Sequence, residues 1–282
     1  MAREALANTC VSPYTMSLKS GAAMTRIASA REGHASIKAF LFKRLVPLAR
    51  GEHDQVGLSS QRSYAEYHHH WLPLVASEVS EAARHFPIVL ADTQTPMLAA
   101  VVGLHRRQSL FIDRHGRWTA PYVPLYLRQM PFHIVRVRNG TAPAQPAICI
   151  DVDAPLVDES LPDKIIAGDR LGTSSQDALE AAKTFEQGAA SSAAFAQALE
   201  RCGLTVPLSS LPEAADCLAL RSLQAVSPTR LREASPQMLA PFTAEARQLV
   251  EACAASAANY AALRELQERR YAQQEAHLRA DL

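Results

Sequence analysis

The stretch PIVLADTQTPMLAAVVGL, residues 87–104, contains two short apolar runs separated by a largely polar segment that ends in a proline. The runs, Pro87–Leu90 and Leu98–Leu104, have the length of strands rather than helices, and the residues between them are typical of a turn. Neighbouring segments of similar length are rich in the β-branched and aromatic residues that favour strands. These further expected strands are residues 109–113, 118–123, 132–137 and 147–152.

The clearest turn signal lies in LFIDRHGRW, residues 110–118. Gly116 can adopt the positive φ that a tight turn requires, and Asp113 can accept backbone hydrogen bonds where the turn begins. We therefore expect a hairpin at this point. A single helix, residues 74–85, is expected among the strands, because its apolar residues recur every three or four positions.

After Pro155 the sequence becomes rich in alanine and carries helix start and stop signals. Serine before proline marks two helix starts, and glycine marks two helix ends. The last helix, about 35 residues at 1.5 Å each, would be roughly 50 Å long, so we expect its end to project or to pair with a second subunit. The expected helices run from Ser174 or Ser175 to Gly188, from about Ser192 to Gly203, from Ser227-Pro228, from Ser235-Pro236, and from Thr243 to about Leu278.

These signals predict an α+β protein with a mainly antiparallel sheet structure. A β-rich part is expected at residues 41–154 and an Ala-rich helical part at residues 155–282, packed as one interdependent unit. Residues 1–40 have no sustained hydrophobic periodicity, so we expect them to form a flexible N-terminal extension.

Composition argues against several classes of binding partner and indicates where in the cell to expect the protein. The chain has 282 residues, with 29 Lys and Arg against 28 Asp and Glu, so its formal charge of +1 gives no basic field for nucleic acid or an anionic membrane. No window approaches the ~20 apolar residues of a membrane span. The five cysteines have no C-x-x-C spacing. Residues 1–31 contain no continuous apolar stretch of the length that a secretory signal needs, so we expect no export by that route. A cytoplasmic protein is the expectation, although the Arg-, Ser- and Thr-bearing start also resembles a transit peptide.

Motifs for metal binding and covalent catalysis are weak. The run His68–His70 contains good metal ligands, but no carboxylate or cysteine is placed beside it by local spacing. Asp113 with His115 and His105 has the residue types of an iron site in the wrong order, and Asp151-Val152-Asp153 lacks a phosphate-binding loop to accompany it. No G-x-S-x-G elbow is present. We therefore expect no metal and no cofactor.

One segment stands out because aromatic residues, arginines and prolines are concentrated in it. Residues 117–132, RWTAPYVPLYLRQMPF, combine one Trp, two Tyr, two Arg and three Pro in 16 residues. Arginine makes bidentate contacts with carboxylates, and aromatic rings bury much area at low entropic cost. The segment therefore suits recognition of a peptide, a protein or a small polar ligand. The alternative is that the rings belong to the core and that the arginines lie at its rim.

The same region also carries a family resemblance. Its order and spacing of residues are similar to those of the SapC family, bacterial proteins named for surface-layer protein loci and unrelated to the peptide-transporter permease of that name. The resemblance covers about residues 45–265 and is most specific between residues 72 and 151. The matching segments are Val46–Leu48 with Glu52-His53, Leu72–Glu78, Phe86–Val89, Leu110–Asp113, Gly116–Trp118, Tyr122–Pro124, Arg128, Pro131-Phe132, Ile148–Asp151 and Phe195–Pro207.

The resemblance implies a bacterial, soluble protein without a membrane span, and it supplies no established reaction. Family members occur in gene neighbourhoods with outer-membrane receptors and with enzymes that resemble flavin-dependent halogenases or oxygenases. The resemblance therefore implies an accessory role in surface-protein, nutrient-uptake or modification systems. The His68–His70 run and the long C-terminal tail depart from the family pattern.

The sequence thus favours a binding or accessory protein over an enzyme. If residues 117–123 form a strand, Trp118 and Tyr122 share one face of it and Arg117 lies on the other. The alternative is a protein- or small-molecule-modifying enzyme that acts with a partner and a metal, with the polar neighbours as acid, base or ligand groups. The expected contact residues are Arg117, Trp118, Tyr122 and Arg128, and the expected polar neighbours are His53, Glu78 and Asp151.

Overall fold

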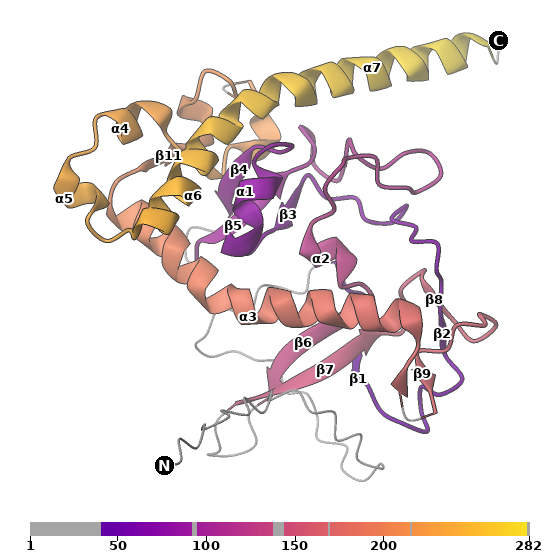
Figure 1. Cartoon of the computed structure of the whole chain (residues 1–282). Coiled ribbons are helices and arrows are strands. Elements are labelled where there is room, and N and C mark those ends of the chain that lie inside the picture. Colours follow the sequence, from indigo (N-terminus) through magenta and orange to yellow (C-terminus); the bar gives the residue numbers. More distant parts are fainter. Residues whose placement is uncertain (1–40, 92–94, 138–143, 169, 215, 281–282) are drawn as a thin grey trace, which may run out of the picture.

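The structure is a computed structural model that describes residues 41–91, 95–137, 144–168, 170–214 and 216–280 (Figure 1). The N-terminal extension expected at residues 1–40 and Cys10 within it lie outside the described residues. The four described cysteines are free thiols.

The larger sheet is antiparallel and has five strands in the order β11-β12-β4-β5-β3. Its centre is the pair β4 and β5, in register from Ile88 opposite Ala100 to Ala91 opposite Met97, which confirms the two strands expected in residues 87–104. Both strands are almost fully buried, as expected for apolar runs without polar alternation. The strands are β3 (Trp71–Pro73), β4 (Ile88–Ala91), β5 (Met97–Val101), β11 (Thr205–Pro207) and β12 (Gln224–Val226).

A second sheet has three antiparallel strands in the order β1-β7-β6. Strand β6 has the expected bounds, whereas β7 begins two residues earlier than expected. Strands β2 and β8 form a separate antiparallel pair, and strands β9 and β10 form another. The bounds are β1 (Leu45–Pro47), β2 (Gly57–Leu58), β6 (Phe132–Val137), β7 (Gln145–Asp151), β8 (Val157–Asp158), β9 (Ile166–Ala167) and β10 (Arg170–Leu171).

Helix α3 (Thr173–Arg201) runs between the two sheets (Figure 1). It contacts β6 on one side and β5 with the 3-10 helix η1 (Ala76–Glu78) on the other, and it also packs against α2 (Leu125–Arg128). On the far side of the larger sheet, α6 contacts β4, β12 and α1. The remaining helices are α1 (Val79–Ala82), η2 (Leu208–Ser210), η3 (Leu218–Leu220), α4 (Pro228–Arg232), α5 (Pro236–Leu239), α6 (Ala244–Ala255), η4 (Ser256–Ala258) and α7 (Asn259–Ala280).

The α+β fold class is confirmed, with strands concentrated in the first half and helices in the second. The second half nevertheless contributes β11 and β12 to the larger sheet, where β12 pairs with β4. The starts of α4 and α5 are also as expected, because the hydroxyls of Ser227 and Ser235 cap them.

The two helices expected on either side of Gly188 are wrong, because α3 passes through this residue without a break. Gly188 is instead a point of close approach, since a Cβ atom there would lie 2.9 Å from the Cβ of Val75. The missing side chain lets α3 pack closely against the segment before η1. The helix expected at residues 74–85 is also much shorter, and it consists of η1 followed by a single turn of α1.

The strands expected at residues 109–113 and 118–123 are also wrong, because only a single bridge, from Ile112 to Trp118, joins these segments. Pro121 and Pro124 have no N–H to donate to a ladder, and the chain bends into α2 instead. Trp118 and Tyr122 therefore do not share a strand face.

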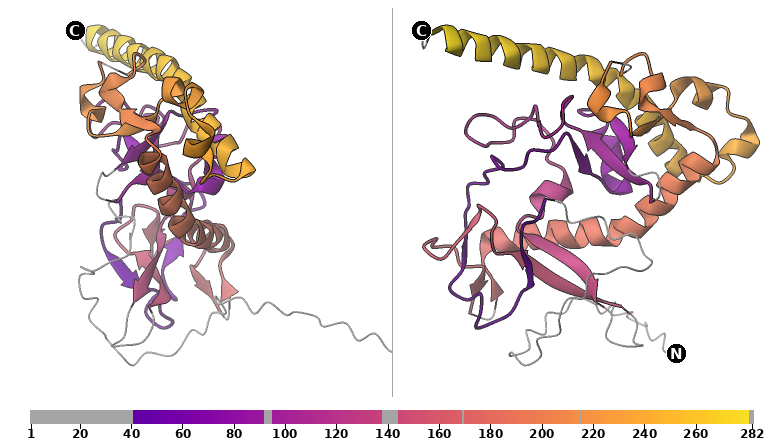
Figure 2. Two further views of the ribbon diagram at one scale, coloured as in Figure 1. Left: turned by 90° about the vertical axis from the view of Figure 1, so that its left-hand side faces the viewer. Right: turned by 180° about the vertical axis from the view of Figure 1, so that it is seen from behind.

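The long helix expected from Thr243 is interrupted at η4, where the Ser256 hydroxyl oxygen accepts a hydrogen bond from the Ile88 N–H at 2.8 Å. This contact ties the helical segment to the start of β4. Beyond the break, α7 runs past the rest of the fold, and its C-terminal end projects (Figures 1 and 2). Pairing of this end with a second subunit stays a prediction.

Candidate functional site

The turn of the expected hairpin is present, although no paired strands flank it, and it fixes Arg117. One Asp113 carboxylate oxygen accepts the N–H groups of His115 at 2.8 Å and Arg117 at 2.9 Å. The other accepts the Arg117 Nε at 2.9 Å, and Gly116 has φ of 75°. The backbone hydrogen bond from Arg117 contributes most to lowering the pKa of Asp113 below its usual range, and the other hydrogen bonds and the charge of Arg117 add to it. The exposed Arg117 side chain thus binds the Asp113 carboxylate and stabilises the turn.

Trp118 is partly buried and belongs to an aromatic cluster with Phe111, Phe86 and Tyr64. The ring centroids lie 5.7 Å from Phe111, 6.1 Å from Phe86 and 6.4 Å from Tyr64. The indole Nε1 donates to the Tyr122 carbonyl at 2.8 Å. Trp118 therefore anchors residues 118–122 against the core.

Glu78 is the polar centre of the site and is only 3% exposed. Its Oε1 accepts the Tyr122 hydroxyl at 2.7 Å and the Leu125 N–H at 2.7 Å, while its Oε2 accepts the Val75 N–H at 3.0 Å. One carboxyl group thus joins the start of η1 to the segment that precedes α2. Because Val75 is three residues before Glu78, a 3-10 turn is enough to form the third bond.

The surroundings of Glu78 shift its pKa in two opposite directions. Burial raises its pKa above the usual range, because a carboxylate loses hydration in the interior. The three hydrogen bonds and the positive charge of Arg128 oppose this effect without cancelling it. Burial and the neighbouring Glu78 also raise the pKa of Tyr122, so its hydroxyl keeps the proton that it donates.

Arg128 differs from the other expected contact residues. It is exposed at the last turn of α2, and no hydrogen bond or ion pair joins its guanidinium to the part of the chain that the structure describes. Burial raises the pKa values of Glu78, Tyr122 and Tyr64, and the positive charge of Arg128 opposes this rise at all three groups.

Two further residues at this place were not expected from the sequence. Arg62 donates through Nη1 to the Arg128 carbonyl at 2.6 Å and to the Met130 carbonyl at 3.2 Å. Gln129 is fully buried, and neither its amide nitrogen nor its amide oxygen has a hydrogen-bond partner among the described residues. A buried amide of this kind calls for a polar partner. Arg62 lies 66 residues from Arg128, so no local motif could have revealed it.

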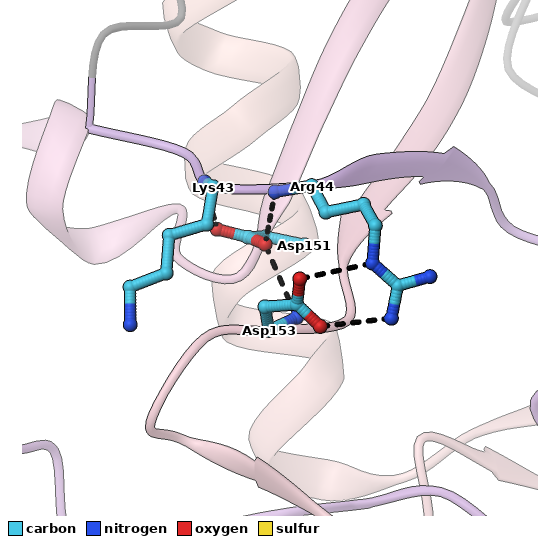
Figure 3. Close-up of polar contacts among 4 residues, drawn as sticks. All are labelled: Lys43, Arg44, Asp151 and Asp153. Atoms are coloured by element: carbon cyan, nitrogen blue, oxygen red, sulfur yellow. Dashed lines mark hydrogen bonds and ion pairs between the residues drawn. The ribbon is translucent and has the colours of Figure 1, made fainter.

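His53 and Asp151 do not contact the group around Glu78. The His53 ring lies 3.1 Å from the Ala49 carbonyl through Nδ1, within its own turn. Asp151 is 1% exposed and accepts the N–H groups of Lys43 at 2.8 Å and Arg44 at 2.9 Å (Figure 3). Both residues therefore hold backbone in place at the second sheet and its neighbouring turn.

No cluster of three or more metal-ligating side chains occurs among the described residues. Within the same residues, no helix is both long and apolar enough to cross a membrane. Cys149 is buried on β7, and burial raises its pKa to about 11, so the thiol is protonated at neutral pH.

Residues 48–263 match the family model described as SapC, and the chain therefore belongs to the SapC family. Neither a curated protein nor a solved structure matches the chain.

Proposed function

We propose that this SapC protein is a binding or accessory protein, and that it recognises a carboxylate of a peptide, a protein or a small polar ligand through Arg128. The observation that carries the proposal is an exposed guanidinium on a fixed backbone, without a side-chain partner among the described residues. Guanidinium groups bind carboxylates through two parallel N–H donors, which gives both affinity and direction.

The backbone around Arg128 is held from several directions, which supports this proposal. Glu78 binds the Leu125 N–H, and Arg62 binds the carbonyls of Arg128 and Met130. A guanidinium presented from such a platform loses less freedom on binding than one on a loose loop.

The contacts of Glu78 favour binding over acid–base catalysis. Both carboxyl oxygens are occupied by donors of the chain itself, and the Tyr122 hydroxyl donates to one of them. A general acid or base must instead reach a proton of the substrate. Glu78 and Tyr122 are therefore proposed as residues that position Arg128. The free thiols are compatible with a reducing compartment, and we propose that the protein acts in the cytoplasm.

A peptide array tests the role of Arg128. Each sequence is synthesised with a free C-terminal carboxylate and again with a C-terminal amide, and the purified chain is applied to both. We expect binding to a subset of the free acids and not to their amides. Arg128→Ala should weaken this binding at least about tenfold, because hydrogen bonds to charged groups contribute ~1.5–3 kcal/mol.

Arg221→Ala is the matched control, because Arg221 is also exposed and has no side-chain partner among the described residues. It should bind as the wild type does, and both variants should keep the wild-type melting temperature. Equal binding of acids and amides, or an Arg128→Ala variant that binds normally, would contradict the proposal.

A further inference from the structure

The run His68–His70 lies beside a second loop that is remote in sequence. The carbonyl of His70 accepts the N–H groups of Val102 at 2.9 Å and Gly103 at 3.1 Å. The loop that follows β5, residues 104–108, is therefore held against the end of the histidine run. This pairing brings His69 and His70 close to Arg106 and Arg107.

The backbone of this loop has an unusual conformation. Arg107 has φ of 58°, in the left-handed region that residues other than glycine rarely adopt. At Gly103 an added Cβ atom would lie 1.9 Å from the Gln108 carbonyl oxygen, so only glycine fits. Strained backbone of this kind persists where surrounding contacts fix it, and it is frequent at binding sites.

Two arginine side chains place positive charge at this loop. Arg106 and Arg107 are exposed, and neither guanidinium forms a hydrogen bond or ion pair within the described ranges. Burial, together with the positive charges of His70, Arg107 and His68, lowers the pKa of His69 to about 4. Burial and Arg106 likewise lower the pKa of His70. The two guanidiniums therefore attract an anion and repel a metal cation.

Helix α7 supports the loop from another side. Arg270 donates through Nη1 to the Ser109 carbonyl at 2.6 Å, and the Tyr271 hydroxyl lies 3.0 Å from His105 Nε2. These contacts fix the two ends of the loop that carries Arg106 and Arg107, while both arginine side chains stay exposed. The loop is therefore a supported platform.

We propose that His68–His70, together with Arg106 and Arg107, form a binding site for a phosphoryl group. A phosphoryl group carries nearly two negative charges and three acceptor oxygens, which two guanidiniums and neighbouring imidazole N–H groups can satisfy together. A carboxylate has only two oxygens, and one guanidinium satisfies both. The site uses none of the residues proposed to bind through Arg128. Its ligand is inorganic phosphate or a phosphorylated small molecule.

The test is isothermal titration of the full chain with inorganic phosphate and, separately, with O-phosphoserine, at constant ionic strength set with chloride. We expect at least one of them to bind, with chemical-shift changes at the imidazole signals of His68–His70. Tighter binding of inorganic phosphate identifies the free anion as the ligand, and tighter binding of O-phosphoserine identifies a phosphorylated molecule.

The double variant Arg106→Gln with Arg107→Asn should weaken this binding at least about tenfold, since charged hydrogen bonds are lost. Asparagine tolerates the left-handed backbone at position 107, so the loop should keep its shape. Arg201→Ala is the control, because Arg201 is exposed at the end of α3 and has no side-chain partner among the described residues. Absence of binding to both probes, or unchanged binding by the double variant, would overturn the proposal.

Discussion

Replacing Glu78 by alanine should lower the free energy of unfolding by about 3–4 kcal/mol, because two buried N–H groups lose their acceptor and each costs ~1–3 kcal/mol. These donors are Val75 and Leu125, and the Tyr122 hydroxyl loses its acceptor as well. Urea unfolding followed by circular dichroism measures the change. The control is Glu81→Ala, which removes an exposed ion pair with Arg84 and should differ little from the wild type. A Glu78→Ala variant as stable as this control would show that the buried carboxyl group does not join η1 to the segment before α2.

The conservative variant Glu78→Gln tests the charge separately through its pH dependence. Burial raises the folded-state pKa of Glu78 above 4.5, so the folded protein binds more protons than the unfolded chain between those two pKa values. The contribution of Glu78 to stability is therefore full below pH 4.5 and falls as pH rises through the folded-state pKa. The stability advantage of the wild type over Glu78→Gln should shrink from pH 4.5 towards pH 8. An advantage that grows with pH would mean that the hydrogen bonds outweigh burial.

The second large effect is expected for Asp151→Ala, at about 3 kcal/mol of lost stability. The buried Asp151 carboxylate accepts the N–H groups of Lys43, Arg44 and Asp153, the last at 3.2 Å (Figure 3). Its removal leaves the chain before β1 without this acceptor. Hydrogen exchange of residues 43–47 should therefore become faster than in the wild type.

Asp153 provides the matched control for Asp151. It lies two residues further along, is exposed, and forms an ion pair with Arg44 at 2.8 Å. Asp153→Ala should unfold close to the wild-type midpoint, because exposed ion pairs contribute little. Equal effects of the two substitutions would show that the backbone hydrogen bonds of Asp151 are not what holds β1.

Local sequence signals predicted those elements whose causes are local. The turn at Asp113 and Gly116 depends on hydrogen bonds within five residues, and the starts of α4 and α5 depend on one serine each. Strand β6 was also located correctly, because β-branched residues and phenylalanine fill it. In these cases the cause and its signal occupy the same short stretch.

Two of the errors have a different origin, since each depends on a contact remote in sequence. Gly188 reads as a helix end, but Val75 lies against it in the fold, and the helix continues. Ser256 reads as part of one long helix, but it accepts a hydrogen bond from Ile88 and the helix is interrupted there. Propensity cannot report such contacts.

Local sequence signals also revealed only part of the candidate site. Segment 117–132 stands out by composition, and the structure brings Tyr122 and Arg128 close to Glu78. The sequence could not show that Arg117 is bound by Asp113, or that Arg62 supports Arg128 from 66 residues away. His53 and Asp151 were grouped with the site because of their residue types, and their contacts lie elsewhere.

Hydrogen–deuterium exchange with a bound ligand tests the central claim, recognition of a carboxylate at Arg128, most directly. The full chain is compared alone, with the free-acid peptide that binds best on the array, and with the amide of that peptide. Slower exchange is expected in residues 117–130 with the free-acid peptide but not with its amide, because the bound acid stabilises the backbone that carries Arg128. Slower exchange confined to other segments, such as β11 and β12, or equal effects of acid and amide, would contradict a carboxylate site at Arg128.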